Sequence, residues 1–167
     1  MSFLLHFDIM HAVRFGFALS LVATLYIGLV LRFHPRVFLR NYPRQIRDAV
    51  PALTANERRQ AAVLAVSFLL ILFGIPYLSV VDLSTHQVTD FSSRYLDAFV
   101  VSMTFNVVDL LIIDIFWLSW FPPSWAQLPG TEHIAYQPEY LPHVRGFAVG
   151  TIVAAALAFL PAVFVAN

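Results

Sequence analysis

Three polar side chains interrupt the apolar segment that runs from Phe105 to Trp120. They are Asn106, Asp109 and Asp114. A carboxylic acid is costly inside a lipid bilayer, and where one occurs it binds a proton, an ion or a polar ligand, or pairs with another polar group. Because we expect no basic residue at the depth of Asp109, that side chain should be protonated or in contact with water or a ligand.

In an α-helix each residue turns the chain by ~100° and advances it by ~1.5 Å, which fixes how these polar residues are spaced around the axis. Ser102, Asn106 and Asp109 then share one stripe. Asp114 lies ~140° around the axis from Asp109 and ~7–8 Å further along it, so the two acids should not share a proton. Two interpretations stay open: the polar groups stabilise helix packing, or Asp109 and Asn106 line a cavity that binds a proton, a cation or a polar ligand group.

Possible partners lie near the two ends of the apolar segments. Arg145 and Arg32 could reach Asp114, because arginine side chains are long and can extend along the membrane normal. The predicted ligand or proton site therefore comprises Asn106, Asp109, Asp114, Arg145 and His143. At the opposite end, a polar cluster is predicted from Arg14, Asp82 and Asp97, which match in depth, with His11 as a further candidate.

Sequence motifs of known catalytic and nucleotide-binding sites are absent. The chain contains no G-x-S-x-G, H-E-x-x-H, G-x-x-x-x-G-K-[ST] or G-x-G-x-x-G pattern. It has no Cys, which excludes thiolate metal sites and thiol redox relays within the chain. His34, Glu132, His133 and His143 lie on one side of the predicted membrane, but we interpret them as scattered interfacial residues and predict no metal site. No cofactor is indicated by the sequence.

The composition is typical of a membrane protein with several spans. Hydrophobic residues make up 59% of the 167 residues and charged residues 12%, whereas soluble domains carry about 25% charged residues. The formal net charge is zero, so nothing indicates a nucleic-acid partner. The N-terminus lacks a basic region and a cleavage site, and the first span is expected to be retained.

Four segments are long and apolar enough for transmembrane helices, since a span needs ~20 residues. They cover about 10–33, 59–81, 95–121 and 145–165. Only helices satisfy their own backbone hydrogen bonds in lipid, so the predicted fold is an all-α bundle of four transmembrane helices forming a single domain, 1–167. Thr54 and Glu57 match a capping box, so the second helix should begin near Ala55, before the membrane.

The distribution of arginine predicts the orientation of the bundle. Five arginines lie in the linker 34–58, and two more flank it at Arg32 and Arg59. The opposite side holds only Arg94 in the loop after the second span. The positive-inside rule places linkers 34–58 and 122–144 in the cytoplasm and both termini outside. Apolar residues among the arginines of the first linker suggest a segment that lies at the headgroup level and binds anionic lipid; they are Val37, Phe38, Ile46 and Val50. The alternative is an ordinary cytoplasmic loop that follows the positive-inside rule.

Small residues recur at every fourth position in two of the spans. The first span has Gly16, Ser20, Thr24 and Gly28, and the fourth has Gly146, Gly150, Ala154, Ala158 and Ala162. Residues four apart lie on one helix face, and small residues there allow helices to approach closely in lipid. We expect the first span to pack on the fourth within one chain. The alternative is that one of the two ladders forms a homo-oligomer interface.

Three segments of the C-terminal half carry a resemblance. The runs DLLIIDIFW at 109–117, LPGTE at 128–132 and HVRGFAVGT at 143–151 resemble small four-helix bacterial integral membrane proteins of uncharacterised function. The resemblance implies a similar four-span fold in a bacterial inner membrane, and it implies no activity.

The functional prediction follows from the intramembrane acids. We expect an integral membrane protein with a polar pocket that binds a small ligand or a proton, or that serves as an accessory subunit of a membrane complex. One alternative is an enzyme or redox subunit acting at the cytoplasmic face on a lipid or quinone-like substrate, through the residues Asp114, Glu132, His133, His143 and Arg145. The other is a small oligomeric transporter or channel. A non-enzymatic role is favoured.

Overall fold

The computed structural model describes residues 7–135 and 137–165, and in this part of the chain the regular structure is entirely helical. The long elements are α1 (Ile9–Phe33), α3 (Ala55–Thr85), α4 (Phe91–Val108) continued by the π-helix η2 (Asp109–Trp120), and α5 (Tyr140–Phe164). Short elements occupy the linkers: η1 (Pro35–Asn41), α2 (Arg44–Ala49) and η3 (Ser124–Ala126). Within these described ranges, four helices, with α4 and η2 counted as one, are long and apolar enough to cross a membrane. The predicted all-helical architecture is confirmed.

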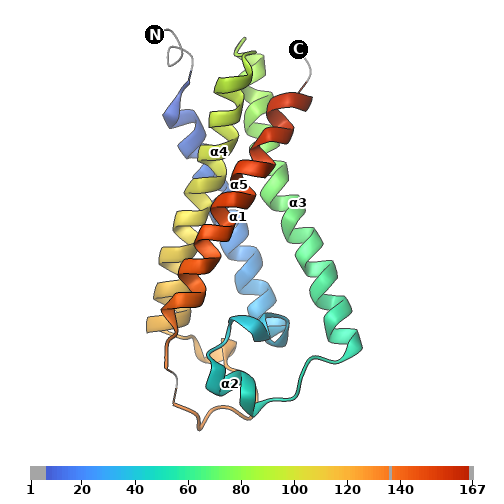
Figure 1. The fold of residues 1–167 in the computed structure, drawn as a ribbon, viewed down its shortest axis with the longest axis vertical. Coiled ribbons are helices and arrows are strands. Elements are labelled where there is room, and N and C mark those ends of the chain that lie inside the picture. Colours follow the sequence, from blue (N-terminus) through green and yellow to red (C-terminus); the bar gives the residue numbers. More distant parts are fainter. Residues whose placement is uncertain (1–6, 136, 166–167) are drawn as a thin grey trace.

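The long helices form an elongated bundle with two distinct ends (Figure 1). We call the end at which α1 begins and α5 finishes the terminal end; the loop between α3 and α4 lies there too. The opposite end, which holds η1, α2 and the segment between η2 and α5, is called the linker end. Towards the linker end α3 diverges from the other helices.

Helix α4 with its extension η2 is the central element of the bundle. It contacts α1 along one side and α5 along another. The core between α1 and α4 is built by Ala12, Leu19 and Ala23 of α1 against Val101 and Phe105 of α4. Burial of these side chains fixes α1 and α4 against each other, and thereby fixes the height at which polar residues of α4 meet their neighbours.

Each ladder of small residues has one glycine that lies close against this central helix, whereas Gly146 of the second ladder is exposed. A methyl group added at Gly16 of α1 would lie 2.5 Å from Cβ of Thr104, and one added at Gly150 of α5 would lie closer than 3.0 Å to the side chain of Asn106. The predicted packing of the first span on the fourth is therefore wrong, because α4 lies between them. The small residues allow close approach, as expected, but to the third span.

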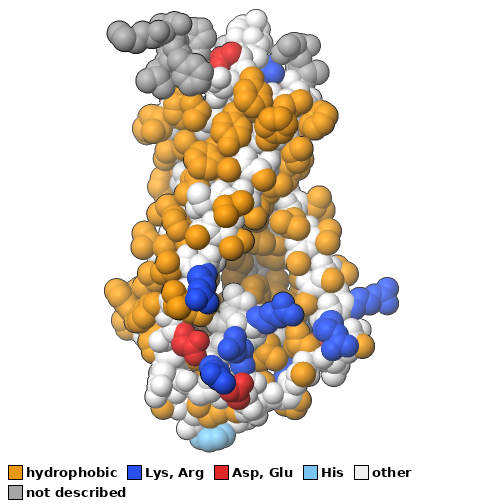
Figure 2. Space-filling model, in the orientation of Figure 1, with side chains coloured by type: hydrophobic (Ala, Val, Ile, Leu, Met, Phe, Trp, Pro, Cys, Tyr) orange, Lys and Arg blue, Asp and Glu red, His pale blue; other side chains and the backbone are white. Residues whose placement is uncertain are grey.

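Large apolar side chains cover most of the visible outer surface between the two ends (Figure 2). On α1 the exposed residues include Phe17, Leu21 and Leu25, each more than half exposed. A soluble protein rarely leaves so continuous an apolar surface in water. This surface suits the hydrocarbon region of a bilayer, whereas the arginine side chains gather towards the linker end.

The two linkers fold together into one cap at the linker end. Ile46 of α2 is buried beside Leu128 of the second linker, and the Tyr42 hydroxyl donates a hydrogen bond to the Ala126 carbonyl. The backbone N–H of Arg44 also donates to the Glu139 carboxylate at 2.8 Å. Ile46 is therefore part of a small internal core, rather than lying among lipid headgroups as the sequence suggested.

Helix α3 begins where the sequence predicted. The Thr54 hydroxyl accepts a hydrogen bond from the Glu57 N–H, and the Glu57 side chain accepts one from the Thr54 N–H at 2.7 Å. This capping box satisfies two backbone donors that the first helical turn would otherwise leave unpaired. Glu57 also forms an ion pair with Arg36 at 2.5 Å, which ties the start of α3 to η1.

Candidate functional site

The central helix changes its hydrogen-bond pattern at the first of the two predicted acids. From Asp109 to Trp120 it is a π-helix, in which hydrogen bonds join residues five apart. At its end the Phe121 N–H donates to the Phe116 carbonyl at 2.9 Å. Long π-helical segments are rare, and π-helical turns are frequent at functional sites.

This geometry corrects the predicted separation of the two acids. Because hydrogen-bonded residues stack above one another in a helix, residues five apart in a π-helix lie on nearly the same face. Asp109, Asp114 and Ser119 have this spacing, and the Ser119 hydroxyl donates to the Asp114 carbonyl at 2.8 Å. The α-helical spacing had placed the two acids on different faces. The π-helix instead brings Asp109 and Asp114 to neighbouring positions.

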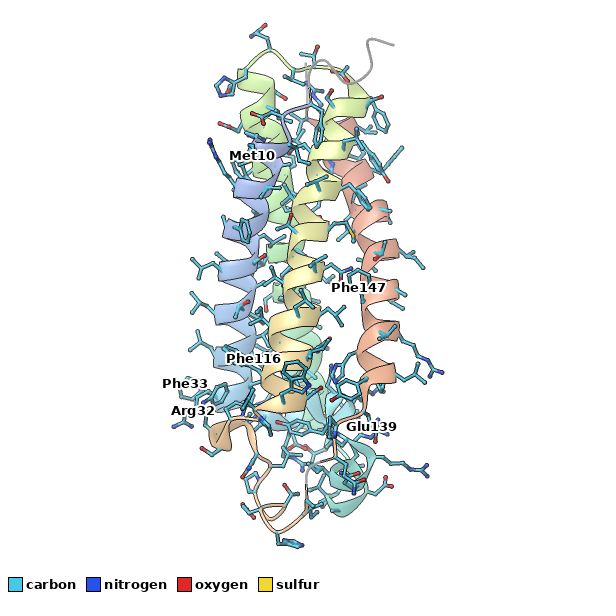
Figure 3. The ribbon with its side chains drawn as sticks, turned by 90° about the vertical axis from the view of Figure 1, so that its left-hand side faces the viewer. Met10, Arg32, Phe33, Phe116, Glu139 and Phe147 are labelled. Carbon is cyan, nitrogen blue, oxygen red and sulfur yellow. The ribbon has the colours of Figure 1, made fainter. Side chains whose placement is uncertain are left out.

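The Asp114 carboxylate lies within hydrogen-bond distance of His143 on α5. Its Oδ1 lies 3.0 Å from His143 Nδ1, and the two side chains are only 16% and 8% exposed. Phe116 on η2 and Phe147 on α5 mark the two elements that hold the pair in Figure 3. His143 is thus the partner of Asp114. The sequence had predicted His143 for the same site but had proposed arginines as the partners of Asp114.

The two arginines proposed as partners of Asp114 lie elsewhere. Arg145 is exposed, and the Arg32 guanidinium lies over the ring of Phe33, 5.7 Å from its centroid. Their side chains extend outwards from the bundle, so neither takes the role predicted for it. Of the five residues predicted for this site, Arg145 is the one that the structure separates from the others.

Asp109 lies one π-helical turn from Asp114, within electrostatic reach of both Asp114 and His143. Among the described residues, no side chain donates a hydrogen bond to its carboxylate. The Ser102 hydroxyl donates to the Ala98 carbonyl at 2.9 Å, and the Asn106 amide donates to α5. Asp109 is therefore a half-buried acid that follows Asn106 on the central helix and lies one π-helical turn from Asp114.

Asn106 continues the polar contacts between α4 and α5. Its Nδ2 donates to the Phe147 carbonyl at 3.0 Å and to the Thr151 hydroxyl at 3.2 Å. The absence of a side chain at Gly150 leaves room for this amide. Asn106, Asp109, Asp114 and His143 thus form one polar seam between the central helix and α5, which we call the inner seam.

A second polar cluster lies at the terminal end, between α1, α3 and α4. His11 Nδ1 lies 2.8 Å from Asp97 Oδ1, and His11 Nε2 lies 3.0 Å from Asp82 Oδ2. Ser79 donates to the other oxygen of Asp97 at 2.5 Å. Asp82 and Asp97 therefore meet as predicted, and His11 is the residue that joins them. The predicted member Arg14 is exposed and outside the cluster.

The contacts of His11 set a minimum number of protons in this cluster. An ionised carboxylate only accepts hydrogen bonds, and a neutral imidazole has a single N–H to donate. Two short contacts between nitrogen and oxygen therefore require two hydrogens. Either His11 is an imidazolium or one of the two aspartates is protonated.

Arg94 is a buried residue that sequence analysis treated only as a loop charge. It is 3% exposed, its Nη1 donates to the Val165 carbonyl at 3.0 Å, and its Nε donates to the Val88 carbonyl at 3.3 Å. It therefore joins the start of α4 to the end of α5. The sequence contained a hint of this burial, because Arg94 lies three residues before Asp97 and the two therefore share one face of the helix.

The remaining histidines and acids of the linker end do not converge on one another. His133 and Glu132 are exposed, and the Glu132 carboxylate accepts a hydrogen bond from the Gly130 N–H at 3.0 Å. Hydrogen bonds from the backbone N–H groups of Glu132 and Gly130 hold the pKa of the Glu132 carboxyl below its usual range. Among the described residues, no group of three or more His, Asp or Glu is arranged to hold a metal ion.

Comparison with known proteins adds no assignment. No protein-family model, curated protein or solved structure matches the chain.

Proposed function

We propose that this chain is a multi-pass membrane protein whose inner seam binds and releases a proton. The observation that carries the proposal is the arrangement of Asp109, Asp114 and His143: a buried histidine–carboxylate pair 3.0 Å apart, with a second acid one π-helical turn away and no hydrogen-bond donor for it among the described residues. Two acids this close in a poorly hydrated environment repel each other when both are ionised, and a bound proton removes the repulsion.

The chemistry of the seam favours a proton over a larger ligand. Its members offer two carboxylates and one imidazole, which exchange protons readily, while the Asn106 amide is already used in bonds to α5. The cavity of about 350 Å³ beside α3 is not lined by a residue of the inner seam. A role as an accessory subunit is compatible with this site. The enzyme alternative has less support, because His133, Glu132 and Arg145 are exposed away from the Asp114–His143 pair.

Infrared difference spectroscopy of the protein in lipid vesicles tests the proton site. A pH step should produce a carbonyl signal from a carboxyl group that gains or loses its proton, and Asp109→Asn should abolish that signal. The matched control is Asp48→Asn, because the Asp48 side chain is 68% exposed and pairs with Arg44 on the surface. In the same series, the ¹⁵N resonances of His143 should shift in Asp109→Asn. A carboxyl signal that persists unchanged in Asp109→Asn would contradict the proposal.

The proposal includes an orientation in a bacterial inner membrane, with the linker end in the cytoplasm. It is supported by the arginines at that end (Figure 2) and by the positive-inside rule. Because the chain has no Cys, single cysteines report the topology directly. In intact cells a membrane-impermeant maleimide should label Thr89→Cys, in the loop at the terminal end, and should leave Ala49→Cys unlabelled until the cells are opened. The reverse pattern would invert the orientation.

A further inference from the structure

Helices α1 and α3 separate towards the linker end and leave a cavity between them. The Tyr26 hydroxyl of α1 donates to the Leu64 carbonyl of α3 at 2.8 Å, and it also contacts the Ser67 hydroxyl at 2.6 Å. Beyond this contact α3 diverges (Figure 1), until the ion pair between Arg36 and Glu57 joins the two segments again. The cavity between these two attachments has a volume of about 350 Å³.

The walls of this cavity are polar at one end and apolar at the other. The lining residues are His34, Asn56, Arg59, Gln60, Val63 and Leu64. Along α3 the polar residues of this set come first and the apolar ones follow, further from the linker end. The cavity thus has the amphipathic gradient of a membrane–water interface, with a cation where a lipid headgroup would lie.

Arg59 has a guanidinium available for an external anion. Several arginines near this end already have partners: Arg36 pairs with Glu57, Arg44 pairs with Asp48, and Arg58 donates to the Leu53 carbonyl at 2.8 Å. The side chain of Arg59 makes no hydrogen bond or ion pair with any described residue. Arginine binds phosphate oxygens through two parallel N–H donors, which makes a phosphate group its natural partner.

We propose that this cavity binds one anionic phospholipid, with its phosphate at Arg59 and His34 and an acyl chain against Val63 and Leu64. The volume lies in the range of small-molecule sites, ~300–1,000 Å³, and accommodates a headgroup and the first part of a chain. The apolar end opens to the surface that faces lipid, since Val63 is 62% exposed. A free phosphate ion would use the cation but gain nothing from the apolar wall. The proposal does not depend on a proton site at Asp109.

Native mass spectrometry of the full chain in mild detergent tests the lipid site. Titration with phosphatidylglycerol should give one tightly bound lipid, and phosphatidylcholine should bind more weakly. Arg59→Gln should weaken the first phosphatidylglycerol about fivefold, the effect of about one interfacial basic residue, and should leave phosphatidylcholine unchanged. Arg40→Gln is the matched control, because Arg40 is an exposed arginine at the same end but outside the cavity.

A second variant tests the apolar half of the site. Val63→Trp fills the cavity from an exposed position, so the fold should be retained while both phospholipids bind more weakly. Inorganic phosphate should not compete with phosphatidylglycerol at equal concentration. The proposal would be overturned if the two phospholipids bound equally, or if Arg59→Gln and Arg40→Gln had equal effects. It would also be overturned if phosphate alone displaced the lipid, or if Val63→Trp left lipid binding unchanged.

Discussion

Replacing Gly16 by alanine is expected to destabilise the protein by about 1–3 kcal/mol, the usual cost of forcing extra volume into a packed interface. The added methyl group would lie 2.5 Å from Cβ of Thr104 and 2.9 Å from its Cγ2. Cβ is fixed by the backbone, so α1 and α4 have to move apart. Thermal unfolding in detergent, followed by tryptophan fluorescence, should show a lower midpoint.

Gly28 supplies a matched control on the same helix. A methyl group there would meet only the Trp117 ring, at 3.9 Å, which is an ordinary contact, so Gly28→Ala should unfold at or above the wild-type temperature. Combining Gly16→Ala with Thr104→Gly removes the clashing side chain and should recover much of the loss. If Gly16→Ala and Gly28→Ala behave alike, the close approach of α1 and α4 is not what Gly16 provides.

The sequence was sufficient to predict the four helices, because the length and hydropathy of a membrane span are local properties of the chain. The start of α3 at Ala55 followed from Thr54 and Glu57 for the same reason. Which helices pack together was not local information. Small residues at every fourth position identify a face for close approach but do not name the helix that fills it, and the ladders of α1 and α5 both face α4.

At the terminal end the structure brings Asp82 and Asp97 together through His11 and leaves Arg14 outside. Arg14 lies on the same stripe of α1 as the exposed Phe17 and Leu21, whereas the buried face is marked by Gly16. Helical periodicity therefore indicated that Arg14 is not on the buried face of α1, because a residue two positions from Gly16 points to the opposite side of the helix. Depth alone could not distinguish Arg14 from His11.

The relation of Asp109 to Asp114 could not be derived from α-helical periodicity. A shift of one residue in the hydrogen-bond pattern, from i→i+4 to i→i+5, changes which side chains share a face. η2 packs against α5, a contact that helical periodicity in the sequence does not contain. Polar residues recur at 109, 114 and 119, five positions apart. This spacing places them on one face only if the segment is a π-helix.

His11 and Asp97 are expected to show the largest loss of stability on single replacement. Asp97 is fully buried and accepts hydrogen bonds from His11 and Ser79. Removing one partner of a buried ion pair leaves the other without compensation, at a cost of about 3–5 kcal/mol. Asp97→Leu and His11→Phe should each lower the unfolding midpoint strongly. Asp82→Asn should do less, because the Asp82 side chain is 46% exposed and hydrated.

A double variant of His11 and Asp97 distinguishes the net contribution of the pair to stability from the cost of removing only one partner. In His11→Phe/Asp97→Leu no charged group of the pair is left unpartnered, and buried ion pairs replaced by apolar side chains of similar volume are often neutral in stability. We therefore expect the double variant to be more stable than either single variant, measured by the same fluorescence assay. Additive losses would mean that His11 and Asp97 act independently. If the double variant recovers stability, the effects of His11 and Asp97 are coupled. Such coupling is expected because one imidazole contacts both aspartates of the cluster.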